Sequence, residues 1–307
     1  MKTSKLVKDP MPFGALKIEK SRYVKALEEI FNHENDWLVW IQNNFEFYEV
    51  YGRNNWGEVM STGYYEPLVR GSHKRSSEFS QALYATPKDL KDGHFKYYSR
   101  REIDSENKLK NQNLELAWVD PIEAFFIQIQ GSGVVEFENG EKIRFGYDRK
   151  NGHYYGALGK FLLAEIPKEK MSMQRIKNHL KTLPRSKQQE IFNKNPSYVF
   201  FKKLEKESLT YAGMEVASGR TIATDSRFFP KGAMAFLDIE EPEFESLSDI
   251  EPKSWKRLPR LVFDQDTGGA IKGGGRVDLY FGPGEVAAQK AGVMKQDGYL
   301  YYLVPKN

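Results

Sequence analysis

The segment from Arg260 to Gly284 constrains the fold of this chain more than any other. It reads RLVFDQDTGGAIKGGGRVDLYFGPG, so two apolar runs, Leu261–Phe263 and Val277–Phe281, flank a turn that holds five glycines. Runs of Val, Leu, Tyr and Phe fit a half-buried pleated surface, which predicts two β-strands. Glycine loses the most conformational entropy on folding. A turn this rich in it therefore indicates positive φ angles or close approach to the backbone.

Three acidic residues, Asp264, Asp266 and Asp278, lie in or beside this turn. Asp266 and Asp278 are at opposite ends of a glycine hairpin, where their side chains can face each other, and glycosidases normally use two carboxylates. An aspartate acting as an acid near neutral pH needs its pKa raised by about two units, through desolvation or a neighbouring carboxylate. The alternative is an ordinary glycine loop with solvated aspartates.

Composition excludes several kinds of site. The 307 residues contain no cysteine, which rules out disulfides, thiolate metal sites and cysteine nucleophiles. GxSxG is absent, and the glycines at 273–275 precede Arg276 rather than the GK[ST] of a phosphate-binding loop. We expect no metal and no cofactor, because the five histidines are scattered without a ligand motif: His33, His73, His94, His153 and His179.

Charge and hydropathy bear on partners and location. The net charge of +4 comes without a compact Lys/Arg stripe, so we expect no nucleic-acid partner. No run of about 18 apolar residues occurs, and the start, MKTSKLVKDPMPFG, lacks the hydrophobic region of a signal peptide. The chain is thus expected to be cytosolic or to have lost its targeting segment.

The periodicity predicts a β-rich chain with its cluster of helices in the middle third. Alternation over Phe125–Phe145 predicts strands joined at an Asn139-Gly140 turn, and Thr210–Ala217 is predicted as another strand. Residues 240–258 are predicted as an inserted loop. Helices are predicted at residues 21–32, at Ala157–Ile166, after Ser172, at Lys187–Lys194 behind a capping box of Ser186 and Gln189, and at residues 285–294.

Polar and aromatic side chains at strand ends are candidates for binding sugars. Tyr64, Tyr65 and Glu66 follow an apolar run at Val59 and could form the wall of a sugar site; the alternative is a buried tyrosine pair with a solvated glutamate. Further along the chain, Gln130, Gly131 and Ser132 interrupt a predicted strand, which indicates either a ligand beside the backbone or a bulge with satisfied polar groups.

Seven motifs together resemble one family. They are TGYYEP at 62–67, YYSRREID at 97–104, AFFIQIQGSG at 124–133, NGHYY at 151–155, MSMQ at 171–174, NPSYVFF at 195–201 and DQDTGGAIKGGGRVDLYFG at 264–282. In this order they resemble the membrane-bound lytic murein transglycosylase A family, and the last resembles a three-aspartate domain that also occurs in other cell-wall proteins.

The resemblance implies a mainly β fold with few helices. Both chain ends, residues 1–82 and 208–307, would build a catalytic double-psi β-barrel. An inserted second β-barrel domain, residues 83–207, would form the other wall of a glycan groove. Before the resemblance is considered, periodicity supports only the β-rich class.

The resemblance also implies a reaction: cleavage of the β-1,4 bond between N-acetylmuramic acid and N-acetylglucosamine in peptidoglycan, without water, leaving 1,6-anhydro ends. Asp278 matches the family's catalytic aspartate, a general acid that then acts as a base. Asp266 and Asp225 match the other two aspartates, with supporting roles. The candidate glycan-binding residues are Tyr64, Tyr65, Glu66, Gln130, Gly131, Ser132 and Lys272.

Family members are usually periplasmic lipoproteins held at the outer membrane through a lipidated cysteine. This chain has neither that cysteine nor a signal peptide, so the resemblance implies anchoring only in a longer precursor. It implies glycan strands as the substrate partner and peptidoglycan synthases as candidate protein partners. A polysaccharide hydrolase with an Asp266–Asp278 pair and a non-catalytic glycan-binding protein are the alternatives.

Overall fold

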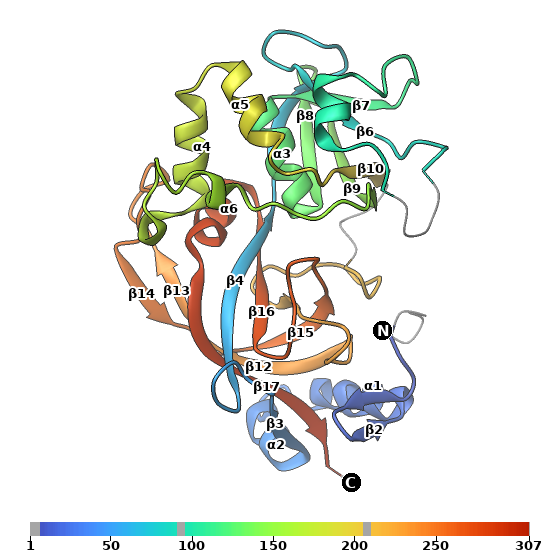
Figure 1. Cartoon of the computed structure of the whole chain (residues 1–307). Coiled ribbons are helices and arrows are strands. Elements are labelled where there is room, and N and C mark those ends of the chain that lie inside the picture. Colours follow the sequence, from blue (N-terminus) through green and yellow to red (C-terminus); the bar gives the residue numbers. More distant parts are fainter. Residues whose placement is uncertain (1–6, 91–95, 205–209, 307) are drawn as a thin grey trace. The chain divides into compact units, whose positions relative to one another are not determined.

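The computed structural model describes residues 7–90, 96–204 and 210–306, and it divides into two compact units (Figure 1). The first unit comprises Met1–Tyr65, Leu209–Gly282 and Val293–Asn307. The second unit comprises Glu66–Ser208 and Pro283–Gly292. The prediction of a mainly β chain, with one domain built from both ends and another inserted into it, is confirmed.

The division differs from the predicted domain limits in two places. Residues 283–292 were predicted to belong to the first domain, but Pro283–Gly292 falls in the second unit. The other difference is at the amino-terminal side. Residues 66–82 were predicted to belong to the first domain, but β5 (Leu68–Ser72) and β6 (Gln81–Tyr84) both pair with β7 (Glu115–Val119) of the second unit. Because these hydrogen bonds tie the segment to the second sheet, the crossover falls at Tyr65/Glu66. The limit predicted at 207–208 lies outside the described residues.

The first unit is built on a barrel of six strands. The order in its sheet is β12-β15-β11-β16-β4-β17-β3, and β12 also pairs with β17, which closes the ring and leaves β3 outside on β17 (Figure 1). Its core is apolar and includes Val262, Val277 and Leu300. The strands are β3 (Phe45–Glu49), β4 (Glu58–Glu66), β11 (Thr221–Ala223), β12 (Ala233–Asp238), β15 (Arg260–Asp266), β16 (Arg276–Pro283) and β17 (Lys295–Pro305).

Smaller elements of the first unit test the sequence predictions. The helix predicted at residues 21–32 is confirmed as α1 (Lys20–Glu29), which a 3-10 turn at Ile30–Asn32 extends. The loop predicted at 240–258 is wrong, because β13 (Glu240–Glu243) and β14 (Ser254–Arg257) pair as a hairpin. The strand predicted at Thr210–Ala217 is also wrong, since this segment consists of turns and irregular backbone with one isolated bridge residue at Glu215. The unit also contains β1 (Met11–Phe13), β2 (Leu16–Ile18) and α2 (Trp37–Asn44).

The second unit carries a six-stranded sheet in the order β10-β9-β8-β5-β7-β6. An isolated bridge between Ala85 and Phe201 links its two outer strands, so this sheet is also barrel-like. The predicted Asn139-Gly140 turn is confirmed, with Gly140 at φ 82° between the paired strands β8 and β9. The strands not yet bounded are β8 (Ser132–Phe137), β9 (Lys142–Lys150) and β10 (Val199–Leu204).

The strand predicted at Phe125–Gln130 is wrong, because the segment is the helix α3 (Pro121–Gln130). Asp120 accepts hydrogen bonds from the backbone N–H of Ile122 and Glu123, and Pro121 stands at the first helical position, where its missing N–H is not needed. Gly131 ends the helix with φ 80°. These end signals override the local alternation.

The other helices confirm only some of the helix predictions made from the sequence. Ser172 caps α4 (Met173–Lys181) by accepting from Arg175 N, as predicted, and α6 (Gly284–Val293) confirms the helix predicted at 285–294. The helix at Ala157–Ile166 reduces to a 3-10 turn at Leu158–Phe161. The Ser186 capping box is wrong, because α5 (Arg185–Phe192) begins directly after Pro184 with no side-chain cap. A further 3-10 turn spans Lys168–Lys170.

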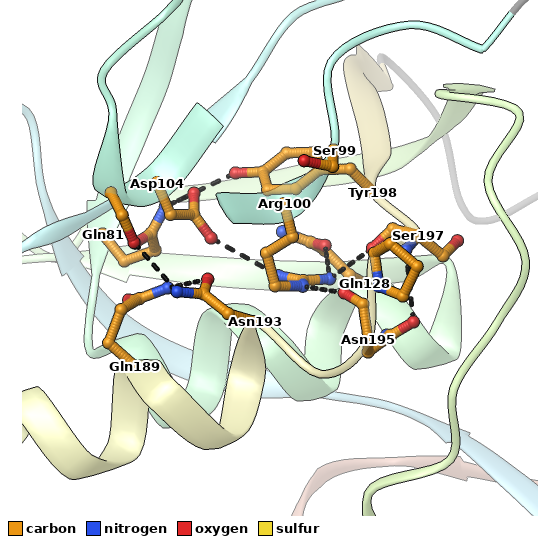
Figure 2. Close-up of polar contacts among 12 residues, drawn as sticks. Gln81, Ser99, Arg100, Asp104, Gln128, Gln189, Asn193, Asn195, Ser197 and Tyr198 are labelled. Atoms are coloured by element: carbon orange, nitrogen blue, oxygen red, sulfur yellow. Dashed lines mark hydrogen bonds and ion pairs between the residues drawn. The ribbon is translucent and has the colours of Figure 1, made fainter. Parts of the chain in front are cut away.

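A buried arginine ties the segments of the second unit together (Figure 2). Arg100 donates to Asn195 O at 3.0 Å, Gln128 Oε1 at 2.7 Å and Ser197 O at 2.8 Å, and it lies 3.6 Å from the carboxylate of Asp104. A π-helical turn at Arg101–Ser105 carries Asp104. With these polar groups satisfied, the cluster is a structural element of the second barrel.

Candidate active site

Asp278 lies on β16, which has β4 and β11 as its neighbours in the first barrel. Thr62 Oγ1, on β4, donates a hydrogen bond to Asp278 Oδ1 at 2.7 Å. The pKa of Asp278 is raised to about 6: burial is the largest cause and the carboxylate of Asp266 adds a smaller rise, while Thr62 and the Arg276 guanidinium act in the opposite direction. An acid with this pKa is partly protonated near neutral pH.

Strand register explains why Asp266 and Asp278 come close. On β11, Ala223 pairs with Asp278 of β16 on one side and with Asp266 of β15 on the other. Adjacent strands lie about 4.8 Å apart, so the two Cα atoms are separated by about 10 Å at the same level of the barrel. A register shift between Ile222 and Ala223 moves the pairing from Asp264 to Asp266.

Asp266 is held by donors from several segments. Tyr64 Oη donates to its Oδ2 at 3.1 Å, and the backbone N–H groups of Tyr211 and Thr267 donate to Oδ1 at 3.1 and 2.9 Å. Burial raises the pKa of Asp266 above its usual value, and these hydrogen bonds oppose the rise. Burial and the carboxylates of Asp266 and Asp278 hold the pKa of Tyr64 well above 10, so its hydroxyl stays a donor.

Asp225 is in a different environment. Arg227 donates to both oxygens of the Asp225 carboxylate from Nε and to Oδ2 from Nη2 at 2.6 Å, and the backbone N–H of Gly273 donates to Oδ2 at 2.9 Å. The Arg227 hydrogen bonds hold the pKa of Asp225 well below its usual range. This carboxylate therefore stays ionised, and it fastens the glycine turn to the segment after β11.

Beneath Asp266 lies a buried charged cluster that the sequence analysis missed in part. Lys231 Nζ lies 2.7 Å from Asp264 Oδ1, and Thr224 Oγ1 and Tyr302 Oη donate to Asp264 Oδ2 at 2.6 and 2.5 Å. The sequence contains one signal for Lys231. This lysine stands between the apolar segments FFP and GAMAFL, and a charged residue inside an apolar stretch indicates a buried lysine that needs a partner.

The predicted binding residues divide between the two units. Tyr64 joins the aspartates, Tyr65 is buried in the first unit, and Lys272 is exposed on the glycine turn. Glu66 is not solvated, because Arg144 donates to its two oxygens at 2.8 and 3.1 Å within the second unit. Gln130, Gly131 and Ser132 lie in the second unit, where α3 ends and β8 begins.

Over residues 7–90, 96–204 and 210–306 the structure contains no group of three His, Cys, Asp or Glu side chains placed to hold a metal ion. His94 is outside these ranges. Within the same ranges, no helix has the length and apolar character needed to cross a membrane.

Comparisons with known proteins agree with this geometry. The family description "MltA specific insert domain" matches residues 60–202, and "3D domain" matches residues 220–304. Membrane-bound lytic murein transglycosylase A of Escherichia coli K12 is 31% identical over 290 residues, which cover 92% of this chain and 76% of the relative. The Vibrio cholerae protein of the same name is 28% identical, with 92% and 77% covered.

Solved structures give the same result. Escherichia coli MltA with bound chitohexaose superposes with a TM-score of 0.79 at 28% identity, covering 94% of this chain and 83% of that one. The membrane-bound lytic murein transglycosylase of Agrobacterium tumefaciens gives 0.77 at 26% identity, covering 96% and 87%. Sequence and fold lead to one conclusion: the chain belongs to the membrane-bound lytic murein transglycosylase A family.

Proposed function

We propose that this protein is a peptidoglycan lytic transglycosylase that cleaves the β-1,4 bond between N-acetylmuramic acid and N-acetylglucosamine without water. The observation that carries the proposal is the state of Asp278, a carboxyl group in a barrel strand with a pKa raised to about 6 by burial. Relatives that bear the name of this activity match over most of the chain.

In the first step, Asp278 acts as a general acid. Thr62 donates to Oδ1, so the carboxyl proton is carried on Oδ2 and passes to the glycosidic oxygen as the bond from that oxygen to the anomeric carbon breaks. The N-acetylglucosamine hydroxyl leaves, and positive charge develops at the anomeric carbon of the muramic acid. When Asp266 is ionised, its negative charge favours this charge distribution.

In the second step, Asp278 acts as a general base. The 6-hydroxyl oxygen of the same muramic acid bonds to the anomeric carbon, and its proton returns to Asp278. The product is the 1,6-anhydro end, and the enzyme regains its starting state. Because an intramolecular nucleophile has an effective molarity of about 10⁵–10⁸ M when well oriented, no second carboxylate is needed to activate water.

We propose supporting roles for the remaining candidates. Asp266 and Tyr64 orient groups beside Asp278, and Asp225 holds the glycine turn that carries Lys272. Glycan contacts are proposed for Tyr64 and Lys272, and for Gln130, Gly131 and Ser132. Tyr65 and Glu66 are each 3% exposed, so we propose that each supports neighbouring residues of its own unit and does not contact the glycan.

A relative's structure holds chitohexaose, which supports a glycan strand as the substrate class. Because peptidoglycan lies outside the cytoplasmic membrane and the relatives are named membrane-bound, we propose a periplasmic, membrane-associated location. Peptidoglycan synthases remain proposed partners.

The test is the chemistry of the cut ends. Purified peptidoglycan sacculi are digested in water labelled with heavy oxygen, and the fragments are analysed by mass spectrometry. We expect anhydro ends without the label. Asp278→Asn should lower the rate about 10²–10⁴-fold with glycan binding retained, whereas Asp297→Asn on the surface should leave it unchanged. Labelled reducing ends from the wild type would refute the proposal.

A second candidate is a hydrolase on the same scaffold. It is favoured by one observation, the placement of Asp266 and Asp278 on either side of Ala223. A hydrolase would need one of the two to activate water, so heavy oxygen would appear at every new reducing end. The same digestion therefore decides between the two reactions.

A further inference from the structure

Lys231 is a lysine in the interior of the first barrel, on the loop before β12, with 5% of its surface exposed. Its ammonium lies 2.7 Å from Asp264 Oδ1, 2.7 Å from Thr224 Oγ1 and 3.0 Å from Thr224 O. A buried ammonium is strongly disfavoured unless it is paired and hydrogen-bonded. This site satisfies both conditions, because the ammonium is paired with Asp264 and hydrogen-bonded to Thr224.

The fourth contact of Lys231 reaches the candidate site itself. Nζ donates to the main-chain oxygen of Asp266 at 2.7 Å, and the backbone N–H of Thr224 donates to the same oxygen at 3.1 Å. Thr224 immediately precedes Asp225. One ammonium thus fixes the two segments that carry Asp225 and Asp266.

We propose that Lys231, paired with Asp264, is a positioning residue for the reaction: its ammonium fixes Asp266 and keeps that carboxylate negative, which in turn keeps the proton on Asp278. This inference rests on the proposed function, because it assigns the control of the acid that the proposed mechanism uses. The family motifs that led to Asp225, Asp266 and Asp278 gave no role to Lys231.

The charged groups around Asp266 and Asp278 support a sequence of effects from Lys231 to Asp266 and from Asp266 to Asp278. Asp266 is faced by Tyr64 from β4, by Asp278 from β16 and by Lys231 from the loop before β12. Burial raises the pKa of Asp266, and Lys231 is among the groups that lower it. Burial also raises the pKa of Asp278, and Asp266 adds to the rise, against Thr62 and Arg276.

The sign of the expected change follows from these contacts. Without the ammonium, Asp266 binds its proton more tightly and carries less negative charge at a given pH. With less repulsion from Asp266, Asp278 then releases its proton at a lower pH. Loss of Lys231 should therefore shift the two carboxyl groups in opposite directions.

The test is a carbon-13 NMR titration of the aspartate carboxyl groups, with the signals assigned from Asp278→Asn and Asp266→Asn. Lys231→Met alone would leave Asp264 buried without its cation, which endangers folding. The main variant is therefore Lys231→Met with Asp264→Asn, whose new amide oxygen can still accept from Tyr302. We expect the titration midpoint of Asp278 to fall by about half a pH unit or more, a threefold change in proton affinity, and that of Asp266 to rise.

Tyr302→Phe is the matched control, because it removes a donor to Asp264 but keeps both charges. It should leave the Asp278 midpoint in place, even where the melting temperature falls. A folded double variant whose Asp278 midpoint equals that of the wild type would overturn the proposal, since a merely structural pair would lower stability without moving the titration.

The titration needs no substrate, so its outcome is separate from that of the proposed function. Where the wild type yields anhydro ends, the alkaline limb of the pH–rate profile should move in the double variant by the same amount as the Asp278 midpoint. A wild type that yields no anhydro ends refutes the transglycosylase alone. An unmoved midpoint refutes the role of Lys231 alone.

Discussion

At the scale of single residues, three aspartates of one barrel differ through their surroundings. Asp225 faces an arginine and a backbone N–H, which stabilise its charge, whereas Asp278 is desolvated and accepts a hydrogen bond from Thr62 on Oδ1. The pKa of the first is lowered and that of the second is raised. The environments therefore separate a structural anion from a candidate acid.

This difference predicts how stability depends on pH. The folded pKa of Asp278, about 6, lies above its ordinary value of 3.8, so its contribution to stability is fully present below about pH 4 and is lost as the pH rises through 6. Asp278→Asn cannot ionise. We expect it to be more stable than the wild type at pH 8, by up to about 3 kcal/mol, and by about half as much at pH 5.

Urea unfolding at the two pH values measures the effect. Asp297→Asn is the control, because Asp297 is an exposed carboxylate whose pair with Arg53 lies at the surface. Its free energy of unfolding should stay within about 0.5 kcal/mol of the wild type at both pH values. An Asp278→Asn effect of equal size at pH 5 and pH 8 would contradict the raised pKa.

The sequence showed the three aspartates and their glycine turn but could not rank them. Which carboxyl is desolvated depends on the pairing of β11 with β15 and β16, and β11 lies more than 35 residues before either of them in the chain. Lys231 was not predicted as a site residue for the same reason. Its ion-pair partner Asp264 lies on β15, 33 residues further along the chain, and the apolar residues around Lys231 indicate burial without indicating that partner.

At the scale of elements, one glycine in the turn before β16 is required because another segment of backbone packs closely against it. A Cβ on Gly275 would lie 2.7 Å from Arg53 N and 2.7 Å from Gly52 C, which are backbone atoms of the loop before β4. Gly275 O also accepts from Met60 N at 2.9 Å. The turn is therefore fastened on one side to β4 and on the other to Asp225 through Gly273.

This packing predicts that Gly275→Ala destabilises the first barrel by about 1–3 kcal/mol, because the backbone must shift to admit the methyl group. Gly269→Ala in the same turn is the matched control. A Cβ there meets nothing within 4 Å, so the change should stay within about 0.5 kcal/mol. Equal unfolding midpoints for the two variants would show that the close approach has no energetic weight.

Elements with strong end signals were predictable, and those set by tertiary pairing were not. The Ser172 cap of α4 and the Asn139-Gly140 turn are local features, and both predictions are confirmed. The segment at Phe125–Gln130 alternates like a strand, yet Asp120 and Gly131 bound it as a helix. Those two signals were present in the sequence and should have outweighed a short alternation.

At the scale of the whole molecule, each barrel has its own apolar core. The clusters around Val262 and around Met234 draw only on residues of the first unit, and those around Phe145, Phe125 and Tyr198 draw only on the second. The sequence could suggest two domains from length alone. The discontinuous arrangement came from the family resemblance, because periodicity does not reveal which distant strands pair.

Because each barrel has its own core, we expect a substitution that destabilises one barrel to leave the other folded. A Cβ on Gly298, where β17 passes from β4 to β12, would lie 2.5 Å from Asp238 O. In the second sheet, a Cβ on Gly71 would lie 2.5 Å from Val135 Cγ1 and 2.9 Å from Trp118 O. Gly298→Ala should speed amide hydrogen exchange in β12, β15 and β17 and spare β8 and β9. Gly71→Ala should do the reverse, so mass spectrometry of the exchanged peptides compares the two variants as mutual controls. Loss of protection in both barrels from either single change would mean that they unfold as one cooperative unit, and the barrel that carries Asp278 could then not be destabilised independently of its neighbour.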